Sequence, residues 1–315
     1  MAGRWDQFIS DSSFATFLHT RRFLSYHGSR FKDASVIIQS DDSEWLGVLP
    51  AAISLERSDQ VVSHPGSTFG GIIHQGKLKG EKMLLALSEI SSFYQKLQVK
   101  ELWYKVVPSI YHPQPNEDDL WALFRLGAKL FRRDLASAVH LRCDVQISER
   151  RRRSIKKAEK ASIKIIEGTE HLAAFWNLLD RHLVARHGRK PAHNLEEISE
   201  LICRFPKNVL CMTAEDSSQI LAGIVIFTSP KVWHLQYSMA SDAGYLVSAL
   251  DALLVHADKR AREAEVMYLD FGVSTTDQGL KLNDGLYTYK SEFGGGGFTY
   301  DHYRIDCSSP LPTIS

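Results

Sequence analysis

The amino-acid sequence predicts a mixed α/β protein with two domains. Strand-like runs alternate with segments whose apolar residues recur at helical spacing, which indicates strands interleaved with helices. The chain has 315 residues, about twice the size of a typical domain. A dense run of arginine and lysine lies near its middle. We place the domain boundary there, with one domain at 1–147 and the other at 148–315.

The first half is expected to alternate short strands with helices. Apolar residues at helical spacing predict one helix, and an asparagine followed by two acidic residues predicts the start of a second. The expected strands are 34–39, 45–55, 101–107 and 136–141, with a polar turn at 41–43 joining the first two. The expected helices are 81–97 and 116–126, the second capped by Asn116.

The second half has a more regular pattern. Two amphipathic helices follow its first strand, three strand-like runs come next, and one further helix precedes each of the last two strands. The order β-α-α-β-β-β-α-β-α-β corresponds to 162–167, 169–187, 195–203, 209–214, 220–228, 232–239, 248–264, 266–273, 286–293 and 298–305.

The basic run before these elements allows two interpretations. Six arginine or lysine residues fall between Arg150 and Lys157, in a segment of helix-forming composition. The segment is either a solvated helix at the seam between the domains or a local site for a phosphate-rich ligand. Nucleic-acid binding requires a wider basic surface than this run provides.

Composition and charge exclude several classes of protein. Lys and Arg total 38 against 37 Asp and Glu, so the net charge of +1 provides no overall attraction to nucleic acid or an anionic membrane. The four cysteines lack metal-ligand spacing, and no metal is expected. The N-terminus lacks a signal-peptide pattern, and no run of about 18 apolar residues predicts a membrane span. We expect a cytoplasmic protein that binds small molecules, without membrane insertion.

A glycine-containing turn is a candidate site for a diphosphate. Residues 241–245 connect a predicted strand to a predicted helix, and the backbone amides at a helix N-terminus suit a phosphate group. Gly244 would let a ligand approach the backbone closely. Turns of this kind are also common without any ligand, and Asp242 would have to point away from a bound diphosphate.

Two histidines are candidate general bases. His193 lies in a short loop just before a helix, where a large side chain has no packing duty, and it is the base that we favour. His234 lies within a strand. Regular alternation would place Gln236 and Ser238 on its face, and Trp233, Leu235, Tyr237 and Met239 on the other. Either histidine can instead be a packed structural side chain.

Asp270 is a further candidate because of its position at the end of an apolar run. A carboxylate at the edge of a buried strand usually has a specific partner. It can orient a histidine, bind a sugar hydroxyl group or cap a turn, and the sequence leaves these alternatives open.

Seven short blocks follow one another in an order typical of one enzyme superfamily. They are 63–71, 150–160, 191–193, 234–237, 270–275, 282–286 and 289–294. In this order they resemble the GNAT N-acetyltransferase superfamily, and within it the FemAB-like branch of tandem GNAT-type domains. The resemblance implies two GNAT-like domains side by side, with the active site in the cleft between them.

This resemblance implies an acyl-CoA donor and an amine acceptor. It places the CoA pyrophosphate on the turn at 241–245, although only Gly244 of the usual signature is present. A tyrosine after the fifth strand would protonate the departing thiolate, and Tyr289 is preferred over Tyr287 because it adjoins Lys290, which would pair with a phosphate. The implied cofactor-binding residues are Tyr237, Ser241, Ala243, Gly244, Tyr245 and Lys290.

The acceptor is expected to bind against a wall of the first domain. Aromatic faces stack on sugars or bases, and a lysine can bind phosphate, although the same aromatic side chains can simply pack in the core. The implied wall residues are Ser67, Thr68, Phe69, Tyr104, Lys105 and Tyr111, with Gln236 and Asn283 added from the second domain.

Three functions follow from this resemblance. The first is transfer of an acetyl or short hydroxyacyl group from acyl-CoA to an amino sugar, expected to be a dTDP- or UDP-linked deoxy sugar for a surface polysaccharide such as an O-antigen. The second is a FemAB-type transfer of an amino acid from charged tRNA to a peptidoglycan precursor. The third is a non-catalytic binding module that keeps the GNAT fold.

Overall fold

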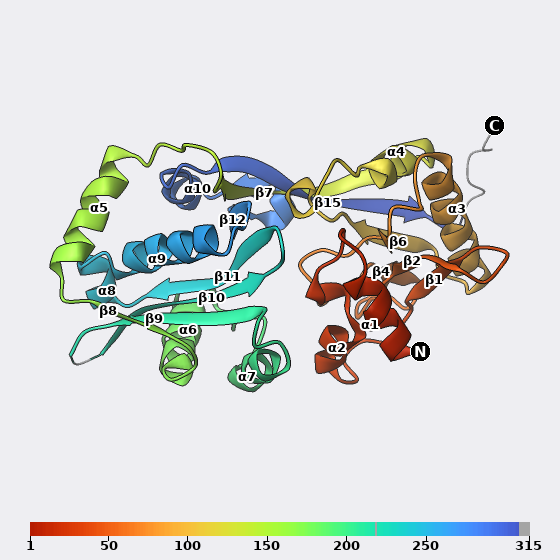
Figure 1. The fold of residues 1–315 in the computed structure, drawn as a ribbon. Helices are drawn as coiled ribbons and strands as arrows, with labels where there is room; N and C mark the ends of the chain where they lie inside the picture. Colours follow the sequence, from red (N-terminus) through yellow and green to blue (C-terminus); the bar gives the residue numbers. More distant parts are fainter. Residues whose placement is uncertain (218, 309–315) are drawn as a thin grey trace. The chain divides into compact units, whose positions relative to one another are not determined.

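The chain divides into two compact units that exchange segments. The computed structural model describes residues 1–217 and 219–308, and only the backbone of His187. The first unit contains Met1–Leu135, Thr275–Lys281 and the described residues from Thr299 onward, and the second contains Ala136–Ser274 and Leu282–Phe298. This division differs from the expected boundary at 147/148 because strands β7 (Lys129–His140) and β15 (Gly296–Asp306) each run from one unit into the other (Figure 1).

The first unit contains short strands, several helical turns and two longer helices. In its sheets the strand orders are β1-β2-β5 and β3-β4-β6-β15-β7. Its elements are α1 (Ala2–Ser10), η1 (Phe17–His19), α2 (Arg21–Leu24), η2 (Ser25–His27), β1 (Val36–Gln39), β2 (Trp45–Leu49), β3 (Ala52–Ile53), β4 (Gln60–Val62), β5 (Ile73–His74), α3 (Glu81–Lys96), β6 (Glu101–Lys105), η3 (Ser109–Tyr111), α4 (Asp118–Arg125), β13 (Thr275–Thr276) and η4 (Asp277–Gly279), and the short β14 (Lys281–Leu282) pairs with β13.

Helices α3 and α4 cover the core of the first unit. The apolar faces that predicted these helices pack together with Leu49, Leu102 and Ile305 from the strands. The expected pairing of β1 with β2 is confirmed, and it is antiparallel. The expected cap is wrong: α4 begins after Glu117, while the side chain of Asn116 is 3.2 Å from Nε2 of His74. The asparagine therefore links the loop before α4 to β5.

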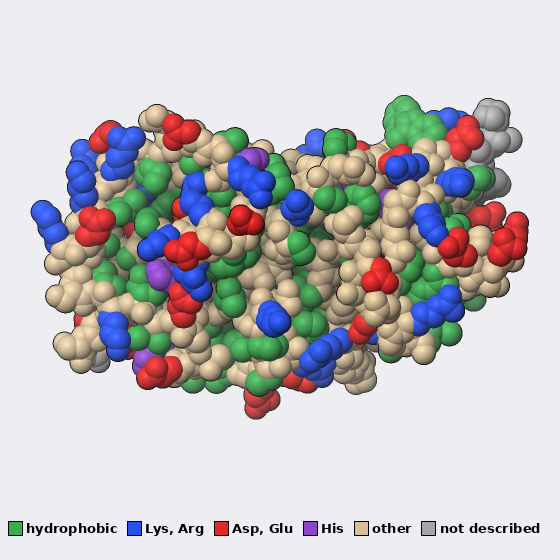
Figure 2. Space-filling view, in the orientation of Figure 1, with side chains coloured by type: hydrophobic (Ala, Val, Ile, Leu, Met, Phe, Trp, Pro, Cys, Tyr) green, Lys and Arg blue, Asp and Glu red, His purple; other side chains and the backbone are tan. Residues whose placement is uncertain are grey.

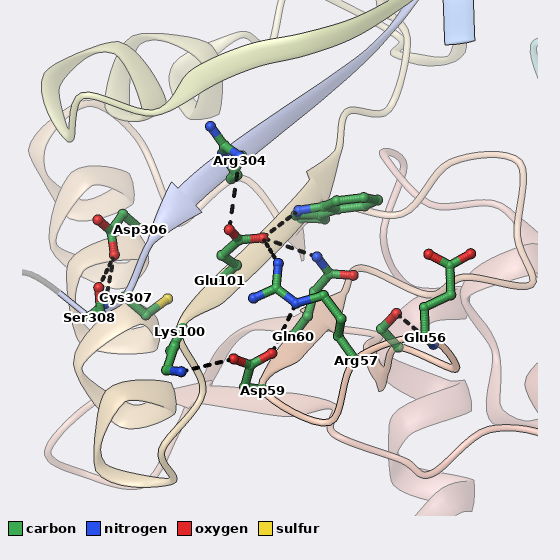
Figure 3. Close-up of polar contacts among 12 residues, drawn as sticks. Glu56, Arg57, Asp59, Gln60, Lys100, Glu101, Arg304, Asp306, Cys307 and Ser308 are labelled. Atoms are coloured by element: carbon green, nitrogen blue, oxygen red, sulfur yellow. Dashed lines mark hydrogen bonds and ion pairs between the residues drawn. The ribbon is translucent and has the colours of Figure 1, made fainter. Parts of the chain in front are cut away.

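A cluster of polar side chains connects three strands of this unit (Figure 3). One carboxylate oxygen of Glu101 on β6 accepts hydrogen bonds from Arg57 and Gln60, each at 3.0 Å. Its other oxygen lies 3.9 Å from the guanidinium of Arg304 on β15. Burial opposes ionisation of Glu101, but its hydrogen bonds with Gln60, Trp103 and Arg57 lower its pKa below the usual value, so its charged form is favoured in the folded state.

The second unit follows the predicted order of elements, with one additional short helix. Its strands are ordered β7-β12-β11-β10-β9-β8. Its elements are α5 (Glu149–Lys160), β8 (Lys164–Glu167), α6 (Leu172–His187), α7 (Leu195–Arg204), β9 (Val209–Glu215), β10 (Ile220–Thr228), β11 (Val232–Ala240), α8 (Asp242–Leu246), α9 (Ala249–Glu263), β12 (Tyr268–Val273) and α10 (Asp284–Ser291). The predicted mixed α/β fold is confirmed.

Helices cover both faces of this sheet (Figure 1). Apolar side chains of α9 pack on one face with Ile224 and Ile226 of β10. On the other face α6 approaches so closely that a side chain at Gly223 would lie 2.2 Å from the ring of Phe175. Central strands β9 and β10 are therefore buried on both sides, which is why their sequences are almost continuously apolar.

A buried ionic network holds the basic helix α5 in place. The Arg151 guanidinium donates to both oxygens of Asp251 on α9 and to Glu292 after α10, each at 2.7 Å. It also lies 4.4 Å from the ring centre of Tyr289. Arg151 and Asp251 are buried, whereas the neighbouring Arg152 is exposed. One arginine of the run is thus structural.

Loss of this network should strongly destabilise the protein. Arg151→Met leaves two largely buried carboxylates without their cation, and we expect the free energy of unfolding to fall by about 3–5 kcal/mol. Urea unfolding followed by circular dichroism measures the change. The control Arg152→Met removes an exposed pair with Glu149 and an exposed hydrogen bond to Gln146, and it should cost less than about 1 kcal/mol. Equal effects of the two substitutions would contradict this role.

Gly244 should be required for packing. A Cβ atom at this position would lie 2.0 Å from the carbonyl oxygen of Leu221 on β10, so Gly244→Ala must displace α8 from the sheet. We expect thermal or urea unfolding to show a loss of about 1–3 kcal/mol. Gly285→Ala on α10 is the matched control, because its nearest neighbouring atom lies at 3.8 Å, and it should cost nothing. A stable Gly244→Ala variant would refute the packing role.

Candidate active site

Two parallel strands of the second unit separate soon after they meet. Strands β11 and β12 pair over three positions only, the last being His234 with Asp270. Both continue beyond this point, β11 to Ala240 and β12 to Val273. In the described sheet no other strand lies between them, so the backbone of β11 from Leu235 onward has no partner on that side. Such an edge can bind an extended ligand through N–H and C=O groups.

A β-bulge in β11 changes which side chains share a face. Leu235 pairs with Ile226 and Tyr237 with Val225, so Gln236 is the extra residue. The expected regular alternation is therefore wrong at this point. The bulge turns Tyr237 onto the face of His234, two ladder positions or roughly 7 Å further along the strand. A buried side-chain oxygen of Gln236 has no hydrogen-bond partner there.

His234 and Asp270 form a dyad where the strands separate. Their side chains meet at 2.7 Å between Nδ1 and a carboxylate oxygen. Asp270 is fully buried, and the His234 side chain keeps 12% of its exposure. This geometry fixes the tautomer with the proton on Nδ1 and leaves Nε2 free to accept a proton. Among the alternatives left open for Asp270, the structure supports two: it contacts a histidine, and through the amide of Gly272 it caps a turn.

The turn after Asp270 holds this carboxylate in place. The amide of Gly272 donates to the second oxygen of Asp270 at 2.6 Å, and Gly272 has a φ of +71°, which favours glycine. The ammonium group of Lys290 donates to the carbonyls of Gly272 and Val273 at 2.9 and 2.6 Å. Burial lowers the pKa of Lys290 to about 8, and the charge of Asp270 opposes this shift. Lys290 thus braces the turn, while the sequence had suggested a phosphate ligand.

His193 lies on the same face as the dyad but makes different contacts. Its Nδ1 is 2.6 Å from the hydroxyl of Tyr237, and its backbone amide donates to the same hydroxyl at 3.2 Å. The ring packs against Phe227 and is 5% exposed. Burial raises the pKa of Tyr237 to about 12, so its hydroxyl stays neutral. His193 and Tyr237 therefore form a second polar pair beside the dyad.

Tyr289 is engaged in the ionic network of α5. Its hydroxyl donates to Asp251 at 2.7 Å. Burial and the neighbouring Asp251 carboxylate raise the pKa of Tyr289. Asn283 caps α10 by accepting from the amide of Leu286. Tyr289 thus contacts α9 and Asn283 caps α10, and both contacts are structural.

The candidate diphosphate turn is largely helical. Ser241 caps α8, with its hydroxyl accepting from the amide of Gly244 and donating to Leu221. Within the described chain, the amides of Asp242 and Ala243 have no hydrogen-bond partner. Tyr245 is 51% exposed. The sequence predicted phosphate contacts along the whole turn. Gly244 faces β10, so only these two amides remain available to a phosphate.

A cavity of about 340 Å³ opens beside this turn. Its walls come from the segment between α5 and β8, from α8 and from the start of β10. Ala243, Leu246 and Val247 contribute an apolar side, and Asp216 provides a charged group. An elongated ligand that lies along α8 can place an apolar part of its structure in this cavity.

Most of the residues expected to form an acceptor wall lie inside the first unit. Phe69, Tyr104 and Tyr111 are buried in its core, as in the packing alternative. Lys105 donates to the carbonyls of His64 and Ser67, and burial lowers its pKa to about 7. Thr68 is partly exposed beside them. The wall stays a prediction.

The described residues also bear on metals and membranes. No group of three or more His, Cys, Asp or Glu side chains among them is arranged to hold a metal ion. None of the described helices is both long enough and apolar enough to span a bilayer.

Comparison with known proteins identifies the type of fold and domain. Residues 146–291 match the model of the acetyltransferase (GNAT) domain. No curated protein sequence shows significant similarity to this chain. A crystal structure of FemX superimposes with a TM-score of 0.72 at 11% identity, covering 98% of this chain and 97% of that one.

Two other solved structures share the fold over nearly the whole chain. L-PGS from Bacillus licheniformis gives a TM-score of 0.62 at 11% identity, covering 98% of this chain and 93% of that one. A tandem GNAT protein from the clavulanic acid biosynthesis pathway gives 0.52 at 11% identity, covering 98% and 95%. The matched domain contains the separating strands and the His234–Asp270 dyad. Residues 146–291 therefore form an acetyltransferase (GNAT) domain, and the chain as a whole shares its fold with FemX and with the tandem GNAT protein.

Proposed function

We propose that this protein transfers an acyl group from a thioester to an amine at the point where β11 and β12 separate. The observation that carries the proposal is the pairing of His234 with the fully buried Asp270 at this point. An amine must be neutral to attack, and an imidazole backed by a carboxylate is a base suited to neutral pH. The amine nitrogen forms a bond to the carbonyl carbon, the carbon–sulfur bond breaks, and the imidazole takes the amine proton.

The proposed donor is acyl-CoA. An extended ligand chain that carries amide groups can form hydrogen bonds with the backbone along the unpaired edge of β11. The amides of Asp242 and Ala243 lie where β11 leads into α8, and they are the proposed contacts for the pyrophosphate. Tyr237, Ser241 and Tyr245 line this route in the proposal. No metal is assigned a role.

The proposed acceptor is an amino sugar, linked to dTDP or UDP. This class comes from the sequence blocks shared with the FemAB-like branch, and Gln236 is its proposed contact in the second unit. The unpaired buried oxygen of Gln236 supports a polar ligand at the bulge, because a buried acceptor without a partner is costly.

A second candidate is transfer of an amino acid from charged tRNA. One observation favours it: the basic side chains of α5, apart from the buried Arg151, are exposed, and Figure 2 shows Lys and Arg side chains gathered where Figure 1 places this helix. These charges would supply one part of the wider basic surface that binding of a tRNA phosphate backbone requires. The exposed basic residues are Arg150, Arg152, Arg153, Lys156, Lys157 and Lys160.

Release of free thiol should identify the donor. We expect purified protein mixed with acetyl-CoA and a panel of dTDP- and UDP-linked amino sugars to release CoA, detected with a thiol reagent, and to yield an acylated sugar by mass spectrometry. Omitting the amine should abolish the release. Thiol release with none of the acceptors, together with salt-sensitive tRNA binding and amino-acid transfer from tRNA, would replace acyl-CoA with charged tRNA as the donor.

Substitution of the dyad should separate the two candidate bases. His234→Asn and Asp270→Asn should each lower kcat by about 10²–10⁴, because one removes the base and the other its orientation. His193→Asn should change kcat by less than about tenfold, since in this proposal His193 supports Tyr237 and takes no proton. Circular dichroism confirms folding of each variant. A large loss for His193→Asn with a small one for His234→Asn would reverse the assignment.

A further inference from the structure

The N-terminal part of the first unit contains a cavity that the proposed reaction does not use. Its volume is about 400 Å³, within the range of small-molecule sites. It is lined by residues of α1, α2 and η2 and by the loops that follow η2 and β4. The residues that determine its chemistry are His27, Phe31 and His64 on one side and Asp6, Arg21 and Asp33 on the other.

Three rings form one side of this cavity. The imidazoles of His27 and His64 are stacked, with ring centres 5.2 Å apart and planes 22° apart. Phe31 meets both rings edge-on, at 4.9 Å from His27 and 5.5 Å from His64. Gly66 packs directly against His27, since a Cβ there would lie 2.3 Å from its ring. The rings are therefore held in a fixed arrangement.

His64 supplies an unsatisfied hydrogen-bonding group. Its side chain is 5% exposed, and its Nδ1 is buried without a hydrogen-bond partner. Burial, followed by the nearby His27 and Lys105, lowers the pKa of His64 to about 3, so its ring is neutral at physiological pH. A neutral imidazole both donates and accepts. A buried polar atom left unpaired has a cost that a bound ligand can relieve.

The backbone of His64 is held in an unusual conformation. Its φ is +41°, in the left-handed region that residues other than glycine adopt uncommonly, asparagine, aspartate and histidine most often among them. The ammonium group of Lys105 donates to the His64 carbonyl at 3.0 Å and to the Ser67 carbonyl. A fully buried lysine, whose pKa is lowered by that burial, thus fixes the loop that presents the His64 ring.

The opposite side of the cavity carries charged side chains that contact one another. Arg21 lies 4.2 Å from the ring centre of Trp5 and pairs with Asp33 at 2.8 Å. The carboxylate of Asp6 accepts from the backbone amides of Arg21 and Arg22 at 2.5 and 3.2 Å. The cavity therefore combines an aromatic wall with a polar rim, and its side chains are already positioned before any ligand binds.

We propose that this cavity is a binding site for a planar heteroaromatic ring with hydrogen-bonding groups on its edge, of the nucleobase type. The flat ring packs on the His27–Phe31–His64 wall, because every base has a face that stacks on aromatic side chains. Its edge exchanges a hydrogen bond with His64, and the rim near Arg21 receives the polar substituent of the ring. The assignment goes beyond the acyl transfer proposed above and concerns the first unit alone.

Binding measured on the full-length protein tests the assignment. Calorimetry or saturation-transfer NMR is performed with uridine, thymidine, adenosine and their monophosphates, and with ribose 5-phosphate as a probe without a ring. We expect at least one nucleoside or nucleotide to bind and ribose 5-phosphate not to bind. The imidazole C–H signals of His27 and His64 should shift in the wild-type protein on binding. Absence of binding by all six ring compounds at about 1 mM would overturn the proposal.

Variants locate the binding. Phe31→Leu keeps an apolar side chain but removes the ring, and His64→Asn keeps a residue that tolerates the left-handed region. Each should weaken binding about tenfold or more. Phe93→Leu, on the exposed face of α3, is the control and should leave binding unchanged. Binding that neither variant weakens, with unshifted His27 and His64 signals, would overturn the assignment.

The same experiment keeps this assignment apart from the proposed reaction. His234→Asn should retain full binding of the ring, because His234 belongs to the second unit. A protein that binds the ring but transfers no acyl group would therefore refute only the proposed function. A protein that transfers acyl groups but binds no ring compound would refute only this site.

Discussion

The active-site proposal depends on one buried carboxylate. Asp270 is fully buried, and a charge in that position is tolerated only with close partners. The structure supplies an imidazole at 2.7 Å, an amide at 2.6 Å and the nearby ammonium group of Lys290. The positive φ of Gly272 and the burial of Lys290 are explained together, because both serve the turn that presents this amide. The dyad is therefore a property of the whole strand–turn–helix segment.

Much of the fold could be predicted because the pattern of apolar residues reports directly on burial. The period of α3 and the apolar runs of β9 and β10 reflect a helix with one buried face and strands buried on both faces. Helix α8 was missed, since five residues carry too little periodicity. In the basic helix the signal was present but unused: Arg151 and Ala158 are seven positions apart, and both are buried.

The candidate site was harder to predict, for reasons of geometry. A single extra residue at Gln236 reverses the faces of the side chains that follow, and nothing in the local sequence marks it. Asp270 and His234 were both candidates, yet their partnership depends on strand pairing across 36 positions in sequence. The roles of Phe69 and Tyr104 could not be predicted for a different reason. An aromatic side chain near a loop suits a binding surface or a core equally well, and only packing distinguishes the two.

The placement of β15 has a consequence for how the chain is made. Strand β6 pairs with β4 on one side and with β15 on the other, and about 190 residues separate β6 from β15 in sequence. During synthesis this edge of β6 has no partner strand until the second unit has emerged from the ribosome. The sheet of the first unit is thus synthesised first but completed last. An unpaired strand edge of this kind is a site where nascent chains can associate incorrectly.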